Sequence, residues 1–397
     1  MSRLARILLL IESSRAYGRG CLAGVAAYVR AHPHWYVIHV ERSLSESPPA
    51  LLKKIVPDGV ITRSETIEMA MAINRLNVPT VDLRGAHRPS AGVTLDTDPV
   101  SCSRLAVDHF IERGFRHLAF CGYPGVGFSD QRGDAFVQYV ADRGLCAEQF
   151  MPSHRSPNFG DTVARETDAE FGERGLDSWI SKLAKPVAVF ACNDVRARQV
   201  LAACGRTGLR VPDDVAVLGV DNDEVICDLS FPPLSSIMPN TWRIGHEGAS
   251  RLDQMLSGNP ITEKRVLIPP EGVQVRRSSD VVAVEDPDVA AALSHIRDHA
   301  CEGISVSDVA RWLAISRTTL DRRFLSILQR SPKSEIDRVR IQRAKQLLEL
   351  TEYKLATVAE MTGYASAPQF LTAFKRLTGI TPGEHRKRHL RSPESFQ

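Results

Sequence analysis

The sequence contains no apolar run long enough to cross a membrane, which requires roughly 20 residues. The stretch ARILLLIE near the start is apolar for only a few residues and then becomes polar, without the small-residue cleavage site of a signal peptide. With 43% hydrophobic and 24% charged residues, the composition is typical of a globular protein. We therefore expect a cytoplasmic protein with no membrane partner.

The cysteines do not form a metal-binding pattern. All eight are scattered, with no C-x-x-C pair and no Cys/His spacing that suits zinc. In a cytoplasmic protein such cysteines stay reduced, and most of them are buried. We predict neither a metal site nor a cofactor.

The short motifs of common catalytic sites are also missing. GxSxG, HExxH and GxxxxGK[ST] are absent, so hydrolase and P-loop functions have no support. One enzyme class remains as an alternative, an NAD(P)-dependent Rossmann-type oxidoreductase with a helical accessory domain, because Gly18 and Gly20 follow a predicted strand and Glu41 ends the next. However, Gly24 comes one residue late for GxGxxG, and Gly18 lies six residues past the strand end, where a phosphate turn should already have begun. We predict that the protein is not an enzyme.

The small net charge of +3 conceals an uneven distribution along the chain. From Arg297 to the end there are 18 Lys and Arg residues against 11 Asp and Glu residues. Basic charge gathered in one terminal segment is typical of a protein that binds a polyanion.

Short apolar segments alternate with helical patterns over the first 220 residues. Each is suited to a buried parallel strand, and they include RILLLIE, WYVIHVE, DGVIT, PTVDL, HLAFCG, VAVFACN and VAVLGVD. This alternation predicts an α/β fold with parallel sheets and helices on both faces. We expect two such lobes in a domain over residues 1–280, one ending near Leu95 and the other near Asp221.

After a linker at residues 281–290, the segment 291–397 shows helical patterns only. Two helix-turn-helix units are predicted near residues 304–328 and 355–377, each with a short second helix. Between them, EIDRVRIQRAKQLLE forms a long helix that could hold the two second helices one turn of DNA apart. Phe374 is expected in the core of the second unit, and its loss should unfold the tail. The fold is therefore an all-α double helix-turn-helix domain after the α/β domain.

The segment GYASAPQFLTAFKRLTGITPGEHR resembles the signature of the AraC-type family of bacterial transcription regulators. The resemblance implies a double-stranded DNA operator as a partner, with RNA polymerase as a further one. A homodimer is expected by default, because the weak paired readout of one chain gains from a second. Ala367 and Pro368 depart from the polar residues common at their positions, which leaves the second unit mainly backbone contacts and shape. The DNA-contacting residues implied by the resemblance are Arg317, Thr318, Asp321 and Arg322 in the first unit, and Ser366, Ala367, Gln369, Thr372 and Lys375 in the second.

The stretch VAVFACNDVRARQVLAACGRTGLRVPDDVAVLGVDNDE resembles the sugar-binding core shared by periplasmic binding proteins and LacI-type repressors. Polar residues just past the strands should face a cleft between the two lobes. Carboxylate and guanidinium groups bind vicinal hydroxyls, and an aromatic ring covers the apolar face of a sugar. The candidate ligand-binding residues are Tyr17, Phe128, Arg132, Asn193, Asp194, Asp221 and Asn222. Arg132 could instead form a structural ion pair with Asp194.

The two resemblances together imply a sugar-responsive, DNA-binding transcription regulator. RAYGRG, CNDVRARQVL, GVDND and IRDHACEGI extend the likeness over most of the chain. They imply xylose or a similar aldose as the small effector, closure of the cleft on that ligand, and activation of aldose catabolism genes.

Overall fold

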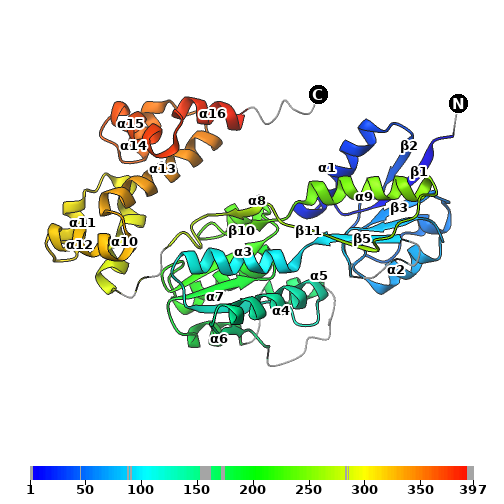
Figure 1. The fold of residues 1–397 in the computed structure, drawn as a ribbon, viewed down its shortest axis with the longest axis horizontal. Helices are drawn as coiled ribbons and strands as arrows, with labels where there is room; N and C mark the ends of the chain where they lie inside the picture. Colours follow the sequence, from blue (N-terminus) through cyan, green and yellow to red (C-terminus); the bar gives the residue numbers. More distant parts are fainter. Residues whose placement is uncertain are drawn as a thin grey trace. The chain divides into compact units, whose positions relative to one another are not determined.

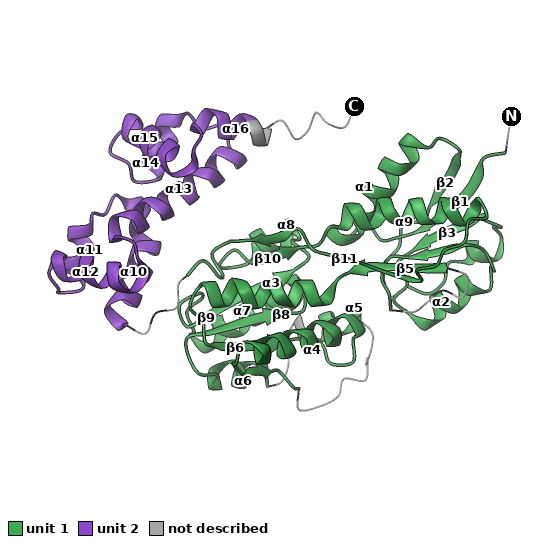
Figure 2. Cartoon of the chain, viewed as in Figure 1, with its two compact units in different colours: residues 1–282 green, residues 283–397 purple. Residues whose placement is uncertain are grey.

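The computed structural model describes residues 3–390 except 45, 87–88, 90–91, 153–161, 171–174, 282–283 and 285. The chain forms two compact units, residues 1–282 and 283–397 (Figure 2). Among the described residues, no helix has the length and apolar character needed to span a membrane. The same residues contain no cluster of His, Cys, Asp and Glu side chains that could hold a metal ion.

The first lobe of the larger unit is built on a six-stranded parallel sheet in the order β11-β5-β4-β3-β1-β2 (Figure 1). Its strands are β1 (Ala5–Leu10), β2 (Trp35–His39), β3 (Gly59–Thr62), β4 (Thr80–Asp82), β5 (Gly92–Thr97) and β11 (Arg265–Ile268). Its helices are α1 (Ala16–Ala31), η1 (Ala50–Lys53), α2 (Ile67–Asn74) and α9 (Thr241–Leu256). Strands β3 and β4 are buried along their whole length, as expected when helices cover both faces of a sheet.

The second lobe has a six-stranded sheet in the order β12-β10-β9-β8-β6-β7, parallel except for the antiparallel β12. Its strands are β6 (His117–Cys121), β7 (Ala147–Gln149), β8 (Val187–Ala191), β9 (Val215–Val220), β10 (Ser235–Met238) and β12 (Gly272–Gln274). Its helices are α3 (Pro99–Glu112), α4 (Gly127–Asp142), α5 (Thr162–Glu170), α6 (Leu176–Lys182), α7 (Asp194–Thr207) and α8 (Glu224–Leu229).

The lobes are not two consecutive segments of the chain. The second lobe does not end near Asp221 as the sequence suggested, because β10 and β12 follow in the same sheet. The chain then returns to the first lobe, where α9 packs along α1 and β11 pairs with β5. Edge strands such as β11 are short and partly exposed, so they lack the continuous apolar pattern that identified the central strands.

Glycines allow α1 and α9 to approach closely. A Cβ atom on Gly24 of α1 would lie 2.0 Å from the carbonyl oxygen of Trp242, and one on Gly245 of α9 would lie 1.9 Å from that of Cys21. Neither distance is possible for a side-chain carbon, so the contact between the helices requires glycine at both positions.

The smaller unit contains helices only, in the part that the structure describes. They are α10 (Pro287–His299), η2 (Ala300–Glu302), α11 (Val306–Trp312), α12 (Arg317–Leu328), α13 (Pro332–Leu350), α14 (Leu355–Met361), α15 (Ala367–Thr378) and α16 (Pro382–Leu390). Helix α10 begins inside the stretch expected to be a linker, where Asp286 caps it by accepting from the backbone N–H groups of Asp288 and Val289. Phe374 is fully buried among side chains of α13 and α14, so its predicted place in the core is confirmed.

Candidate functional site

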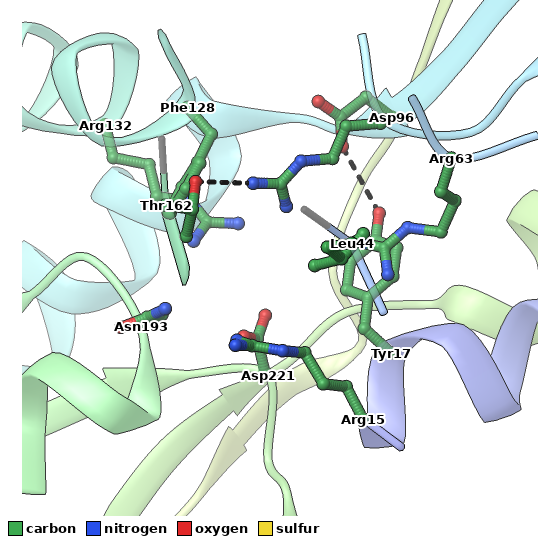
Figure 3. Close-up of a pocket in the computed structure, with 11 residues that line it drawn as sticks. Arg15, Tyr17, Leu44, Arg63, Asp96, Phe128, Arg132, Thr162, Asn193 and Asp221 are labelled. Carbon is green, nitrogen blue, oxygen red and sulfur yellow. Dashed lines mark hydrogen bonds between the residues drawn. The ribbon is translucent and has the colours of Figure 1, made fainter. Parts of the chain in front are cut away.

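A small polar pocket lies between the two lobes of the larger unit (Figure 3). Its lining comes from both lobes, at the carboxyl ends of parallel strands, which is where open α/β sheets bind ligands. Arg63 follows β3, Arg84 follows β4 and Asp96 lies near the end of β5, while Asn193 and Asp221 follow β8 and β9. The lining residues are Arg15, Tyr17, Leu44, Arg63, Arg84, Asp96, Phe128, Arg132, Thr162, Asn193 and Asp221.

Three of the four guanidinium groups in the lining are paired with glutamates. Arg63 forms an ion pair with the buried Glu12. The Nε atom of Arg84 lies 2.5 Å from an oxygen of Glu65. Arg15 donates to both carboxylate oxygens of Glu166, at 3.1 and 2.5 Å. The charges of these three arginines are therefore largely balanced before any ligand enters.

The fourth guanidinium, that of Arg132, is buried and donates one hydrogen bond to the carbonyl oxygen of Cys192 at 2.5 Å. The carboxylates that act electrostatically on it include those of Asp96 and Asp221. Burial raises the pKa of Asp221 to about 6, although Arg132, Arg63 and other arginines oppose this shift. Burial raises the pKa of Asp96 as well, against the attraction of Arg132 and Arg84. A hydroxyl of a ligand that donates to either carboxyl would favour its ionised form.

The backbone turns sharply at Asp221. Its φ of 115° and the φ of 47° at Asn222 lie in the left-handed region, which is uncommon for residues other than glycine. The amide of Asp221 donates to the carbonyl oxygen of Ile237, which helps to hold this turn at the end of β9. Strained backbone of this kind is concentrated at functional sites, and here it accompanies a carboxylate that lines the pocket.

The structure brings five of the seven predicted ligand-binding residues to this pocket and places two outside its lining. The five are Tyr17, Phe128, Arg132, Asn193 and Asp221. Asp194 accepts from the hydroxyl of Ser236 at 2.5 Å and from the amide of Asp223 at 2.8 Å. Asn222 accepts from Arg276 at 2.8 Å. Both Asp194 and Asn222 are thus engaged within the second lobe.

The ion pair considered between Arg132 and Asp194 is not the arrangement in the structure. Arg132 contacts the carbonyl of Cys192, and the carboxylate of Asp194 is engaged with Ser236 and Asp223. Burial, with a further contribution from Asp221, raises the pKa of Asp194 well above its usual range. The side chain of Arg132 is therefore left to face the pocket.

The two aromatic rings support guanidinium groups. Arg63 lies 4.3 Å from the ring centre of Tyr17, whose hydroxyl lies 3.2 Å from Asp96 and 2.9 Å from Thr97. Arg84 and Arg132 lie 4.9 and 5.1 Å from the ring centre of Phe128. These cation–π contacts fix the directions of three of the four arginines in the pocket.

The sequence patterns did not indicate several lining residues. Most of the charged side chains of the pocket are among them. Arg63 and Arg84 follow strands that had been identified, so the rule that selected Asn193 and Asp221 would have found them. Asp96 lies on β5, which had not been predicted as a strand. Arg15 precedes α1 and Thr162 begins α5, and neither carries a comparable signal. The missed lining residues are Arg15, Leu44, Arg63, Arg84, Asp96 and Thr162.

Polar contacts between the lobes surround the pocket. Besides the Arg15–Glu166 pair, Arg84 donates to the hydroxyl of Thr162 at 2.9 Å, and Glu65 accepts from the Thr162 amide at 3.1 Å. Glu166 also accepts from the side-chain amide of Asn193 at 2.7 Å. Thr162 and Glu166 both belong to α5, so this helix of the second lobe is hydrogen-bonded both to residues of the first lobe and to Asn193.

The glycines behind the oxidoreductase alternative lie within α1 and have a packing role. A Cβ atom on Gly18 would lie 2.1 Å from the carbonyl oxygen of Glu12, and one on Gly20 would lie 1.9 Å from the hydroxyl of Thr241 in α9. Because these glycines have no side chain, α1 can pack closely against the residue that follows β1 and against α9. These glycines do not form a phosphate-binding turn at the end of β1.

In the smaller unit, most of the predicted DNA-contacting residues are exposed on α12 and α15. Arg317, Thr318 and Arg322 are exposed on α12, and Arg317 lies 3.7 Å from the partly buried Asp321. Ser366 caps α15 by accepting from the Gln369 amide. On α15, Gln369, Thr372 and Lys375 are exposed, while Ala367 is partly buried.

The comparisons with known proteins agree with this architecture. A periplasmic binding protein-like domain matches residues 107–279, and a helix-turn-helix domain matches residues 309–388. The xylose operon regulatory protein of Escherichia coli strain K12 is 29% identical over 96% of this chain and 96% of its own length. The protein of the same name from Haemophilus influenzae is 29% identical over 96% of this chain and 98% of its own.

The solved structure of a xylose-binding transcription activator, xylR, is similar to the whole chain. Its TM-score is 0.75 at 28% identity, and the match covers 97% of this chain and 98% of that one. None of these relatives supports the oxidoreductase alternative. The chain is a DNA-binding transcription regulator, not an enzyme, in which a periplasmic-binding-protein-like domain precedes a helix-turn-helix domain, as in the xylose operon regulatory proteins it resembles.

Proposed function

We propose that the pocket between the lobes binds a neutral aldose, xylose or a close relative, and that this ligand controls transcription through the helical unit. The observation that carries the proposal is the set of pocket charges. Three arginines are already paired with glutamates, and the fourth faces two carboxyls of raised pKa. A sugar acid or sugar phosphate would add negative charge to a pocket without an uncompensated positive charge to receive it.

Hydroxyl groups suit this lining better than charged groups do. Each sugar hydroxyl donates one hydrogen bond and accepts others. Guanidinium groups of Arg15 and Arg132 and the amide of Asn193 supply donors, while Asp96 and Asp221 supply acceptors. The names of the similar proteins, two xylose operon regulatory proteins and a xylose-binding activator, support xylose as the first candidate.

The ligand would act by stabilising the closed arrangement of the lobes. Its hydroxyls would reach residues of both lobes at once, such as Arg15 of the first and Asn193 of the second. Binding energy realised only in the closed form shifts the population toward that form. The protein would work in the cytoplasm as a homodimer, and it would activate transcription by contact with RNA polymerase.

Recognition of DNA is assigned to α12 and α15, the second helices of the two helix-turn-helix units. They are connected through the 19-residue helix α13, which is roughly 28 Å long at 1.5 Å per residue. One turn of DNA is about 34 Å, so one chain could place the two helices in successive major grooves.

Calorimetric titration of the full chain with sugars tests this proposal. We expect D-xylose or another neutral pentose to bind. Asp221→Asn should lower the affinity at least tenfold, because it alters the buried carboxylate that would accept a hydrogen bond from the sugar. D-xylonate serves as a control that is similar in size but negatively charged, and we expect it to bind at least tenfold more weakly. Tighter binding of D-xylonate would contradict the charge argument, and equal affinity of the Asp221→Asn variant would remove this residue from the site.

A further inference from the structure

The two helix-turn-helix units can be compared position by position, because they repeat at an interval of 50 residues. Ser316 and Ser366 both cap their helices by accepting from a backbone amide three residues on. Phe324 and Phe374 are both fully buried. Both helices also end at a residue in the left-handed conformation, Gln329 and Gly379. Side chains at equivalent positions of α12 and α15 therefore lie on the same side of the helix, relative to the core of their own unit.

At these equivalent positions, α12 carries charged side chains, whereas those of α15 are uncharged and mostly apolar. Arg317, Asp321 and Arg322 of α12 correspond to Ala367, Leu371 and Thr372 of α15. Leu371 is 39% exposed, and Thr372 and Pro368 are exposed as well. Ala367, Pro368, Leu371 and Thr372 thus occupy the positions in α15 that are equivalent to the predicted DNA-contacting residues of α12. We call these four residues the apolar face of α15.

Hydrogen bonds within the unit make this face less polar than the sequence suggests. The hydroxyl of Thr372 donates to the carbonyl oxygen of Pro368 at 3.0 Å, so its hydrogen is used inside the helix. The guanidinium of Arg376 is directed to Asp337 of α13, at 2.9 Å. Beside the apolar face, Gln369 and Lys375 are exposed polar residues of α15.

An apolar side chain can still distinguish bases in the major groove. The thymine methyl is the only apolar group that the four base pairs display there, and side chains such as Ala and the Thr methyl contact it. Arginine, in contrast, binds the O6 and N7 atoms of guanine, and glutamine binds adenine. The two units therefore differ in the chemical feature of DNA that each can recognise.

We infer that α15 reads thymine methyl groups through its apolar face, whereas α12 reads guanine through Arg322. This inference rests on the proposed assignment of α12 and α15 to the major groove. One operator half would then contain a guanine-bearing element and, about one helical turn away, an element with thymines. Burial of one methyl group changes affinity by about fourfold.

Replacement of thymine by deoxyuridine tests the inference, because it removes only the methyl group and leaves base pairing intact. The operator is first selected from random duplexes with the full-length protein, and Arg322→Ala identifies the element that α12 contacts. Each thymine of the duplex is then replaced in turn by deoxyuridine. We expect losses of about fourfold per methyl at thymines roughly 10 base pairs from the guanine element.

The protein side is tested with Thr372→Ser, which removes one methyl and keeps the hydroxyl that bonds to Pro368. In this variant the penalty for at least one deoxyuridine should disappear, as expected for two groups in direct contact. Thr318→Ser is the matched control on α12, and it should leave every penalty in the thymine element unchanged.

Two results would overturn the inference: unchanged affinity for every deoxyuridine in that element, or penalties that are the same in the parent and in Thr372→Ser. A full-length protein that selects no sequence at all would instead contradict the assignment of α12 and α15 to DNA, and the inference with it.

Discussion

The contact between α5 and the first lobe predicts that Glu166→Gln opens the pocket. Arg15 donates to both oxygens of Glu166, whose side chain is only 5% exposed, and Asn193 donates to the same carboxylate. Glutamine keeps the shape but removes the charge and one acceptor. A hydrogen bond to a charged group is worth about 1.5–3 kcal/mol. The substitution should destabilise the closed form by about that free energy relative to the open form. Ligand affinity should then fall by roughly 10- to 100-fold.

Two measurements check this prediction. Calorimetry with D-xylose gives the affinity, and small-angle scattering without ligand should show a larger radius of gyration for Glu166→Gln than for the parent. The matched control is Asp177→Asn, which breaks an ion pair with Arg206 of similar geometry, at 2.9 and 2.6 Å, on the exposed surface of the second lobe. Equal effects of the two substitutions on affinity and size would refute a specific role for the Arg15–Glu166 pair in closure.

Three further predictions concern the site, the packing and the DNA contacts. Burial raises the pKa of Asp221 to about 6, and sugar hydroxyls favour its ionised form, so affinity should fall as pH drops below about 6; calorimetry of Asp221→Asn should show a weaker dependence, because Asp96, whose pKa burial also raises, remains in the pocket. Gly24→Ala should lower the melting temperature by several degrees, since overpacking costs typically about 1–3 kcal/mol, whereas Gly205→Ala, with open space around its Cβ, should not. Arg322→Ala should cost about 1–3 kcal/mol of DNA binding and relax specificity at one base pair, as measured by selection from random duplexes.

The central elements of the fold could be predicted from sequence because their signals are strong. Strands such as β8 and β9 are continuous apolar runs, and the helix-turn-helix units combine helical periodicity with a specific motif. The path of the chain between lobes could not be predicted in the same way. Strand β11 alternates buried and exposed residues over only four positions, and its partner β5 ends in polar residues. Their pairing depends on tertiary contacts that no local pattern records.

Only part of the candidate pocket could be predicted, for a related reason. Asp221 and Asn193 follow strands with obvious apolar patterns, so their position at the cleft could be inferred. Arg15 and Thr162 reach the pocket only because the lobes face each other, and each bonds to a residue of the opposite lobe. Asp194 stands next to Asn193, but its carboxylate turns to Ser236. A sequence places a residue at the strand end without showing the direction of its side chain.

The most direct test of the account is the affinity of the full-length protein for its selected operator, measured with and without D-xylose. Asp221→Ala and Asp177→Asn are measured beside the parent, the second as a surface control. If occupancy of the pocket controls the helical unit, the sugar changes operator affinity in the parent and in Asp177→Asn, and the change is absent in Asp221→Ala, which still binds DNA as the sugar-free parent does. An operator affinity that responds to the sugar equally in Asp221→Ala and the parent would contradict the account.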